Sequence, residues 1–253
     1  MRACWKAIAL FSALVAVWPA RSADLQLSPV SIQFTGAEKA QALWLMNTGT
    51  QPLHAQVRLF RWSQADDEDR LEPTQALAAS PPMVEIAPGR TQMVRIVRRE
   101  DAAAGDEQSF RLLVDEIPVR PAAAAGGDAP QAASGSGLQL VLRYSVPVFV
   151  NDVAVPRDAP AVGVAGAWAG GDTPTLTLAN PARRRVRVSH VVHEDAQGRR
   201  TVLVPGLLGY VLSGQRRRWG MPASARSLAP GVIKARLQDT AQEYSLATIS
   251  GAP

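Results

Sequence analysis

The chain has 253 residues, a formal net charge of +5 and one cysteine, Cys4. That length suits two domains of roughly 100 to 130 residues each, and the cysteine count excludes a disulfide framework. The charge is weak evidence for nucleic-acid binding, because almost every basic residue is Arg, a bias that we attribute to genome composition.

Residues 1–23 have the features of a secretory signal peptide. Arg2 and Lys6 precede a short apolar run at 7–18, and small residues then offer a cleavage site after Ser22 or Ala23. The run is too short to span a bilayer, and no later segment is apolar enough to do so. We therefore expect an exported protein without membrane insertion and, since Cys4 lies in this segment, without a thiol in its mature form.

Short segments of alternating apolar and polar residues recur from residue 24 onward, separated by Gly, Pro, Asn and Asp. Alternation at every second residue predicts β-strands with one buried face. We expect seven strands in a first domain, 24–152, at 25–34, 40–47, 54–62, 82–86, 91–98, 109–117 and 138–150. Residues 77–80 could hold one helical turn. Seven strands with this spacing indicate a β-sandwich of immunoglobulin-like type.

The segment 138–150 is the most regular of these strands. All of its even positions are bulky and apolar: Leu138, Leu140, Leu142, Tyr144, Val146, Val148 and Val150. It follows residues 121–137, which are too poor in apolar side chains to order themselves. One interpretation is an internally packed last strand of the first sandwich. The other is an edge strand that pairs with a second polypeptide.

The alternating pattern restarts in a second domain, 153–253. We expect strands at 161–168, 174–179, 185–192, 200–204, 208–213, 216–219, 232–238 and 243–249, with the hinge at 152–160. This half holds 13 basic and 6 acidic residues, whereas residues 24–152 hold 11 and 16. Its Arg clusters at 183–187 and 216–218 could meet an acidic partner or a membrane surface, but a solvated face is the more common arrangement.

Catalytic and metal-binding patterns are missing from the sequence. His54, His190 and His193 are the only histidines, and the last two would point to opposite faces of a strand. The acidic run at 66–69 lacks the spaced ligands of a calcium loop, and there is no phosphate-binding loop or nucleophile elbow. We expect no enzyme activity, no metal and no cofactor.

Several motifs occur in a characteristic order. They are ALWLMNTG at 42–49, VRLFRW at 57–62, SPPMVEIAPG at 80–89 with QMVR at 92–95, and FRLLVDEIP at 110–118. LTLANP at 176–181 and YVLSGQRRRW at 210–219 follow in the second half. This series resembles the periplasmic pilus-assembly chaperones of chaperone–usher systems. LRYSVPVF at 142–149 is similar to their archaic branch, which assembles thin pili or spore-coat-U-like subunits.

The resemblance implies an all-β chain of two immunoglobulin-like β-sandwich domains in a boomerang arrangement. It also implies donor-strand complementation in the periplasm, in which the chaperone's seventh strand fills the groove of a subunit that lacks its last strand. The donors would be Leu138, Leu140 and Leu142, with Tyr144 extending the set. The implied partners are pilus or coat subunits and an outer-membrane usher. An unpaired apolar edge also favours self-association of the free chaperone.

One departure from the family concerns the subunit's C-terminal carboxylate. In the better-known branch, an Arg on the first strand and a Lys late in the seventh bind it, but Ser31 and Pro147 stand at those positions here. A carboxylate still needs a cationic partner, so Arg143, Arg95 and Arg58 are the candidates. Arg143 is favoured because it shares a strand face with Pro147.

Two other functions are open at this stage. A secreted pilus subunit would be one incomplete domain, whereas this chain has strands for two. An adhesive or carbohydrate-binding β-sandwich would expose clustered aromatic residues, whereas the tryptophans here lie in alternating segments of core type.

Overall fold

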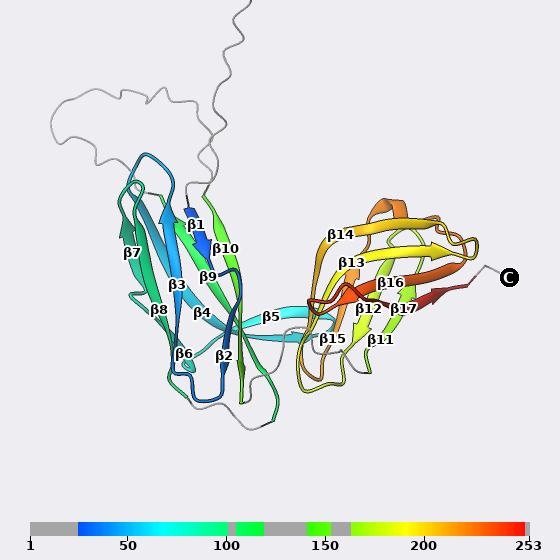
Figure 1. Cartoon of the computed structure of the whole chain (residues 1–253), viewed down its shortest axis with the longest axis horizontal. Helices are drawn as coiled ribbons and strands as arrows, with labels where there is room; N and C mark the ends of the chain where they lie inside the picture. The colour runs from blue at the N-terminus through cyan, green and yellow to red at the C-terminus, as the bar shows by residue number, and fades with distance from the viewer. Residues whose placement is uncertain (1–24, 101–104, 119–140, 153–162, 251–253) are drawn as a thin grey trace, which may run out of the picture.

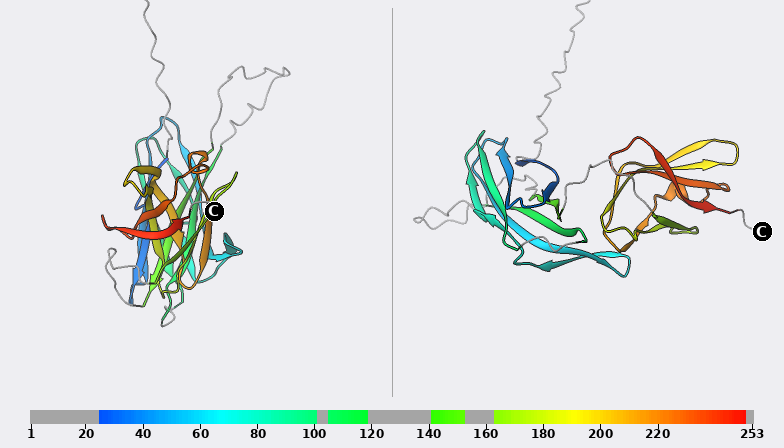
Figure 2. Two further views of the ribbon diagram at one scale, coloured as in Figure 1. Left: turned by 90° about the vertical axis from the view of Figure 1, so that its right-hand side faces the viewer. Right: turned by 60° about the horizontal axis from the view of Figure 1, so that its bottom comes forward.

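The computed structural model describes residues 25–100, 105–118, 141–152 and 163–250. They form two β-sandwich domains set at an angle to each other (Figure 1 and Figure 2). The only helical element in these ranges is one 3-10 turn, Ala223–Ala225, and none of their helices is long and apolar enough to cross a membrane. The expected all-β class, with two sandwiches in a boomerang, is confirmed. The expected signal peptide and the hinge beyond Asp152 lie outside the described residues.

The first domain contains two sheets packed face to face. One sheet has the order β1 (Leu25–Ser28), β3 (Ala40–Asn47), β8 (Thr91–Arg98) and β6 (Leu77–Ser80). The other has the order β2 (Ile32–Thr35), β10 (Arg143–Asn151), β9 (Gln108–Ile117), β4 (Leu53–Ala65) and β5 (Glu68–Pro73), with β7 (Met83–Ile86) also paired to β4. The inward positions of both sheets meet in one apolar core that contains Phe34, Leu45 and Phe110.

Two predictions for this domain need correction. The expected single strand at 25–34 is two strands, because β1 pairs with β3 while β2 pairs in parallel with β10 of the opposite sheet. The expected helical turn at 77–80 is wrong, since these residues form β6, pair with β8 and bury Leu77 in the core. Pairing with a neighbouring strand decides the conformation of so short a segment.

The second domain has a core of its own. One sheet has the order β11 (Ala165–Ala169), β12 (Thr175–Ala179) and β15 (Arg216–Gly220). The other has the order β14 (Arg200–Val211), β13 (Val186–Asp195), β16 (Gly231–Leu237) and β17 (Glu243–Ile249). The two strands expected at 200–204 and 208–213 are the single strand β14. Its internal Pro205 is tolerated because β14 is the edge of its sheet and is paired irregularly with β13.

The described half of the segment 138–150 belongs to the first sandwich. Tyr144, Val146, Val148 and Val150 all pack in or against its core. The Tyr144 hydroxyl also donates a hydrogen bond to the Leu25 carbonyl. The interpretation as an internally packed strand therefore holds for residues 144–150, whereas Leu138 and Leu140 lie outside the described residues.

Candidate functional site

Strand β10 has a hydrogen-bonded neighbour on both sides only at its C-terminal end. β9 pairs with residues 143–150 of β10, whereas β2 pairs only with 148–151. The Glu116 N–H donates to the Leu142 carbonyl at 3.1 Å, so even positions of β10 direct their main-chain groups toward β9 and odd positions direct theirs away. Within the described part of the chain, no strand pairs with the odd positions 143–147. This edge can therefore accept an added strand.

Pro147 lies on the open edge of β10. As an odd position, it would direct an N–H away from β9, so the proline removes no bond from the existing ladder. Its Cα partner on β9 is Arg111. At the level where the better-known chaperones carry a lysine on the seventh strand, this protein therefore carries a cation on the adjacent strand.

A cleft of about 670 Å³ lies between the two domains next to this edge. Ser31, Ser145 and Pro147 line it from the first domain, and Tyr210 and Trp219 line it from the second. The two positions that replace the basic residues of the better-known branch thus open into one cavity.

Four arginines line the same cleft: Arg111, Arg185, Arg187 and Arg217. Three of them have an acidic partner, namely Glu107 for Arg185, Asp239 at 3.2 Å for Arg187, and Asp69 at 3.7 Å for Arg217. In the described residues Arg111 forms no ion pair, although the Asp69 carboxylate, which also lines the cleft, interacts with it electrostatically.

Arg111 is held by stacking rather than by an acid. Its guanidinium carbon lies 3.6 Å from the centroid of the Trp62 ring. Burial lowers the pKa of Arg111, but an arginine remains charged at neutral pH. A partly desolvated guanidinium of fixed orientation suits bidentate binding of a carboxylate.

An aromatic cluster beside the cleft joins the two domains. Trp62 and Phe149 of the first domain contact Tyr210 of the second, with ring centroids 6.0 and 5.6 Å from it. Arg185 also stacks on Phe149, with its guanidinium carbon 3.6 Å from the ring centroid. The floor of the cleft is therefore a packed surface.

The expected anchor residues are not together in the cleft. Arg58 and Arg143 both bind Asp115, with Arg58 Nη2 2.6 Å from Asp115 Oδ2. Both arginines lie on the same outer face of the sheet as Pro147, but Arg143 is four residues before Pro147 on β10, or about 13 Å away along the strand. Arg95 is exposed on β8, in the other sheet of the sandwich. Arg111, which lines the cleft in register with Pro147, was not among the expected anchors.

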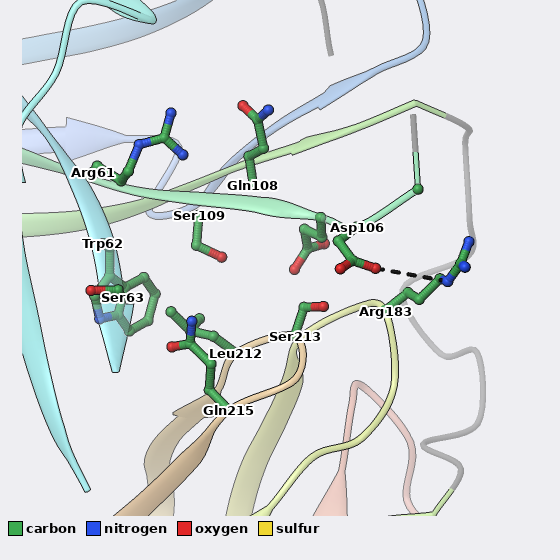
Figure 3. A pocket seen from close by; sticks show the side chains of 12 residues that line it. Arg61, Trp62, Ser63, Asp106, Gln108, Ser109, Arg183, Leu212, Ser213 and Gln215 are labelled. Carbon is green, nitrogen blue, oxygen red and sulfur yellow. Dashed lines mark ion pairs between the residues drawn. The ribbon is translucent and has the colours of Figure 1, made fainter. Parts of the chain in front are cut away.

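A second cavity of about 540 Å³ lies at the domain junction (Figure 3). Trp62, Ser109 and Ser213 line it, and a 3.8 Å ion pair joins Asp106 to Arg183 at one end. The Trp62 Nε1 and the Ser109 Oγ are buried and have no hydrogen-bond partner among the described residues. A polar cavity of this kind suits ordered water.

The described residues contain no group of three His, Cys, Asp or Glu side chains that could hold a metal. The two histidines of β13 differ in environment: His193 is buried, whereas His190 lies 3.7 Å from Glu243. Neither belongs to the cleft.

The family model for pili and flagellar-assembly chaperones, PapD N-terminal domain, matches residues 24–155, just over half of the chain. The chain belongs to this family. The resemblance to pilus-assembly chaperones is thereby confirmed, and this family consists of chaperones rather than enzymes. A comparison with curated protein sequences found no match.

Solved structures of low sequence identity share the fold of this chaperone. One is a chain of the CsuC–CsuE chaperone–tip subunit pre-assembly complex from the archaic Csu pili of Acinetobacter baumannii, with 23% identity and a TM-score of 0.61 over 90% of this chain and 100% of that one. Another is a chain of the Salmonella enterica SafA pilin complex with the SafB chaperone, with 16% identity and a TM-score of 0.59 over 90% of this chain and 98% of that one. A third is the E. coli chaperone DraB, with 17% identity and a TM-score of 0.54 over 88% of this chain and 98% of that one.

Proposed function

We propose that this chaperone binds pilus or coat subunits in the periplasm by donor-strand complementation and delivers them to an outer-membrane usher. The observation that carries the proposal is the open edge of β10 beside a cleft that contains Arg111, which forms no ion pair in the described residues. The CsuC and SafB structures are complexes with a tip subunit and a pilin, which supports subunits of this kind as partners.

The donor side chains are proposed to be Leu138, Leu140 and Leu142. They continue the even phase of β10, whose later members already fill the chaperone's own core. Tyr144 marks the boundary, because its hydroxyl is bonded to Leu25 inside the first domain. Each leucine buried in a subunit would contribute about 1.5–3 kcal/mol.

We assign the subunit's C-terminal carboxylate to Arg111 rather than to Arg143, Arg95 or Arg58. Arg58 and Arg143 share the single carboxylate of Asp115, and neither of them lines the cleft, whereas Arg95 is on the other sheet. The cleft walls also carry exposed Val30 and Leu207, which suit an apolar terminal residue.

The anchor is tested by co-expression with a subunit from the same pilus system. Arg111→Gln should reduce the yield of complex at least about tenfold, because the carboxylate would lose its charge-assisted hydrogen bonds. It should also remove the preference for a subunit peptide with a free C-terminus over its C-terminal amide. The control is Arg143→Ala, which should leave both unchanged. The reverse pattern would move the anchor to Arg143.

The donor strand is tested by Leu140→Asp, with Gln139→Asp on the opposite strand face as its control. We expect Leu140→Asp to abolish the complex, since a charge cannot enter an apolar groove unpaired, while circular dichroism shows the free chaperone folded. An unfolded variant would mean that Leu140 belongs to the chaperone's own core.

The same edge is open to a second copy of the chain when no subunit is bound. We propose concentration-dependent self-association that the subunit suppresses. Sedimentation velocity of the free chaperone, with and without subunit, measures it; a monomer at all concentrations would contradict it.

A further inference from the structure

The hairpin formed by β4 and β5 extends from the first domain to β15 of the second (Figure 1). Its tip residues, Asp66 and Asp67, have φ angles of 54° and 64°. Aspartate and asparagine are among the few residues other than glycine that tolerate this left-handed conformation. The tip is therefore a tight two-residue turn that carries two carboxylates.

The two aspartates face different surroundings. The Asp66 side chain is 81% exposed and pairs with Arg70 of its own hairpin. The Asp67 side chain is only 5% exposed and pairs with Arg216 and Arg218 of the second domain.

The main chain of Asp67 continues this contact. Its carbonyl accepts hydrogen bonds from the Arg218 N–H at 3.1 Å and from the Arg217 guanidinium. Because side chains alternate along β15, the carboxylate holds Arg216 and Arg218 on one face while the carbonyl holds Arg217 on the other. Arg217 is the member of this run that lines the cleft.

Gln64 attaches the same hairpin to the cleft floor. Its Nε2 donates to the Tyr210 carbonyl at 2.8 Å, and its Oε1 accepts from the Leu212 N–H at 2.9 Å. The hairpin is therefore bonded both to β15 and to the end of β14, two of the strands that line the cleft from the second domain.

We propose that Asp67 is a positioning residue for subunit binding. It fixes the second domain against the first and holds Arg217 in the cleft, so it acts on a subunit without touching it. The effect on subunit binding rests on the function proposed above, whereas the effect on the contact between domains does not.

Electrostatics explain why the charge at residue 67 matters. The Asp67 carboxylate is buried although Arg216 and Arg218 are more than half exposed, so solvent screens its ion pairs less than it screens the pair of the exposed Asp66. Asp67→Asn would leave Arg216 and Arg218 facing each other. Asp66→Asn makes the same chemical change one residue away and removes only a surface pair, so it is a matched control. Asparagine also keeps the left-handed turn.

The first test is amide hydrogen exchange in the free chaperone. Asp67→Asn should speed exchange of the Arg218 N–H at least about tenfold, while the buried amides of β13 stay protected. Asp66→Asn should change neither. Unchanged protection of Arg218 in Asp67→Asn would overturn the proposal. If that variant does not fold, Arg218→Gln breaks the same pair from the second domain, with exchange of the Leu212 N–H as readout.

The second test is subunit binding. Asp67→Asn should weaken it at least about tenfold and reduce the preference for a free C-terminus over the amide, whereas Asp66→Asn should bind as the unaltered chaperone does. Faster exchange with unchanged binding would refute the positioning role. If Leu140→Asp also binds normally, the donor-strand function fails instead, and the exchange result still decides whether Asp67 fixes the domains.

Discussion

At the scale of single residues, the cations on the outer face of the β10 sheet differ in their partners. Arg58 and Arg143 share one carboxylate, that of Asp115 on β9. Arg111 lies four residues before Asp115 on β9 and stacks on Trp62 instead. From the sequence alone, one can predict on which strand and on which face of that strand an arginine lies. The sequence does not show which arginine already has an acid opposite, because that depends on the register between β9 and its neighbours.

Asp115 predicts an acid-dependent loss of stability. Burial raises its pKa, but hydrogen bonds from Arg143 and Arg58 outweigh this, so the pKa lies below its ordinary value. A carboxyl group with a lowered folded-state pKa stabilises the protein above its unfolded value of about 3.9 and loses that contribution as the pH falls through the folded value. Asp115→Asn should flatten this part of the curve.

Urea unfolding at a series of acid pH values measures the effect of Asp115→Asn. The difference in slope from the unaltered chaperone is limited to about 1.4 kcal/mol per pH unit for one proton. Equal slopes for the two proteins would show that Asp115 does not contribute, and Asp66→Asn provides an exposed control.

At the scale of strands, alternation predicts most elements but not their partners. The strands expected at 91–98 and 243–249 match β8 and β17 residue for residue. The division of 25–34 between two sheets was missed, because both of its halves alternate and only long-range pairing separates them. The strand β6 was missed because four residues carry too little pattern. Likewise, the sequence shows which residues of β10 face the core, but it does not show that β2 leaves the odd positions 143–147 unpaired.

Gly166 of β11 illustrates a packing constraint that the sequence does not reveal. A Cβ atom there would lie 2.4 Å from the Leu246 carbonyl oxygen of β17, so β11 and β17 approach too closely for any side chain. Gly166→Ala should destabilise the second domain by about 1–3 kcal/mol. Gly220→Ala on β15 meets open space and should be neutral. Thermal unfolding of both variants checks this; equal midpoints would contradict it.

At the scale of the whole molecule, the angle between the domains is fixed by polar contacts on two sides. The β4–β5 hairpin makes one set, and Glu107, ahead of β9, makes the other by accepting hydrogen bonds from the Arg185 side chain and N–H. The boomerang arrangement was predicted only through the family resemblance, because neither Glu107 nor Asp67 has a sequence pattern that identifies its partner in the other domain.

Glu107 should therefore couple the unfolding of the two domains. Its side chain is fully buried beside Arg185, so Glu107→Gln leaves an uncompensated charge and should cost about 3 kcal/mol. In calorimetry, we expect the domains to unfold more separately than in the unaltered chaperone. Asp106→Asn, which removes an exposed pair with Arg183, should leave the trace unchanged; an equal effect of both would contradict the coupling.

Pro147 gives the open edge of β10 a fixed end. Here the edge offers a carbonyl but no N–H, and Arg111 lies directly opposite on β9. If the terminal carboxylate of an added strand is held there, the position of its last residue fixes the register of that strand against β10. Shifting a strand by one residue exchanges its two faces, so lengthening the subunit by one residue would turn its apolar side chains away from the groove. In the proposed complex, the terminus of the subunit would therefore determine the alignment of the whole added strand.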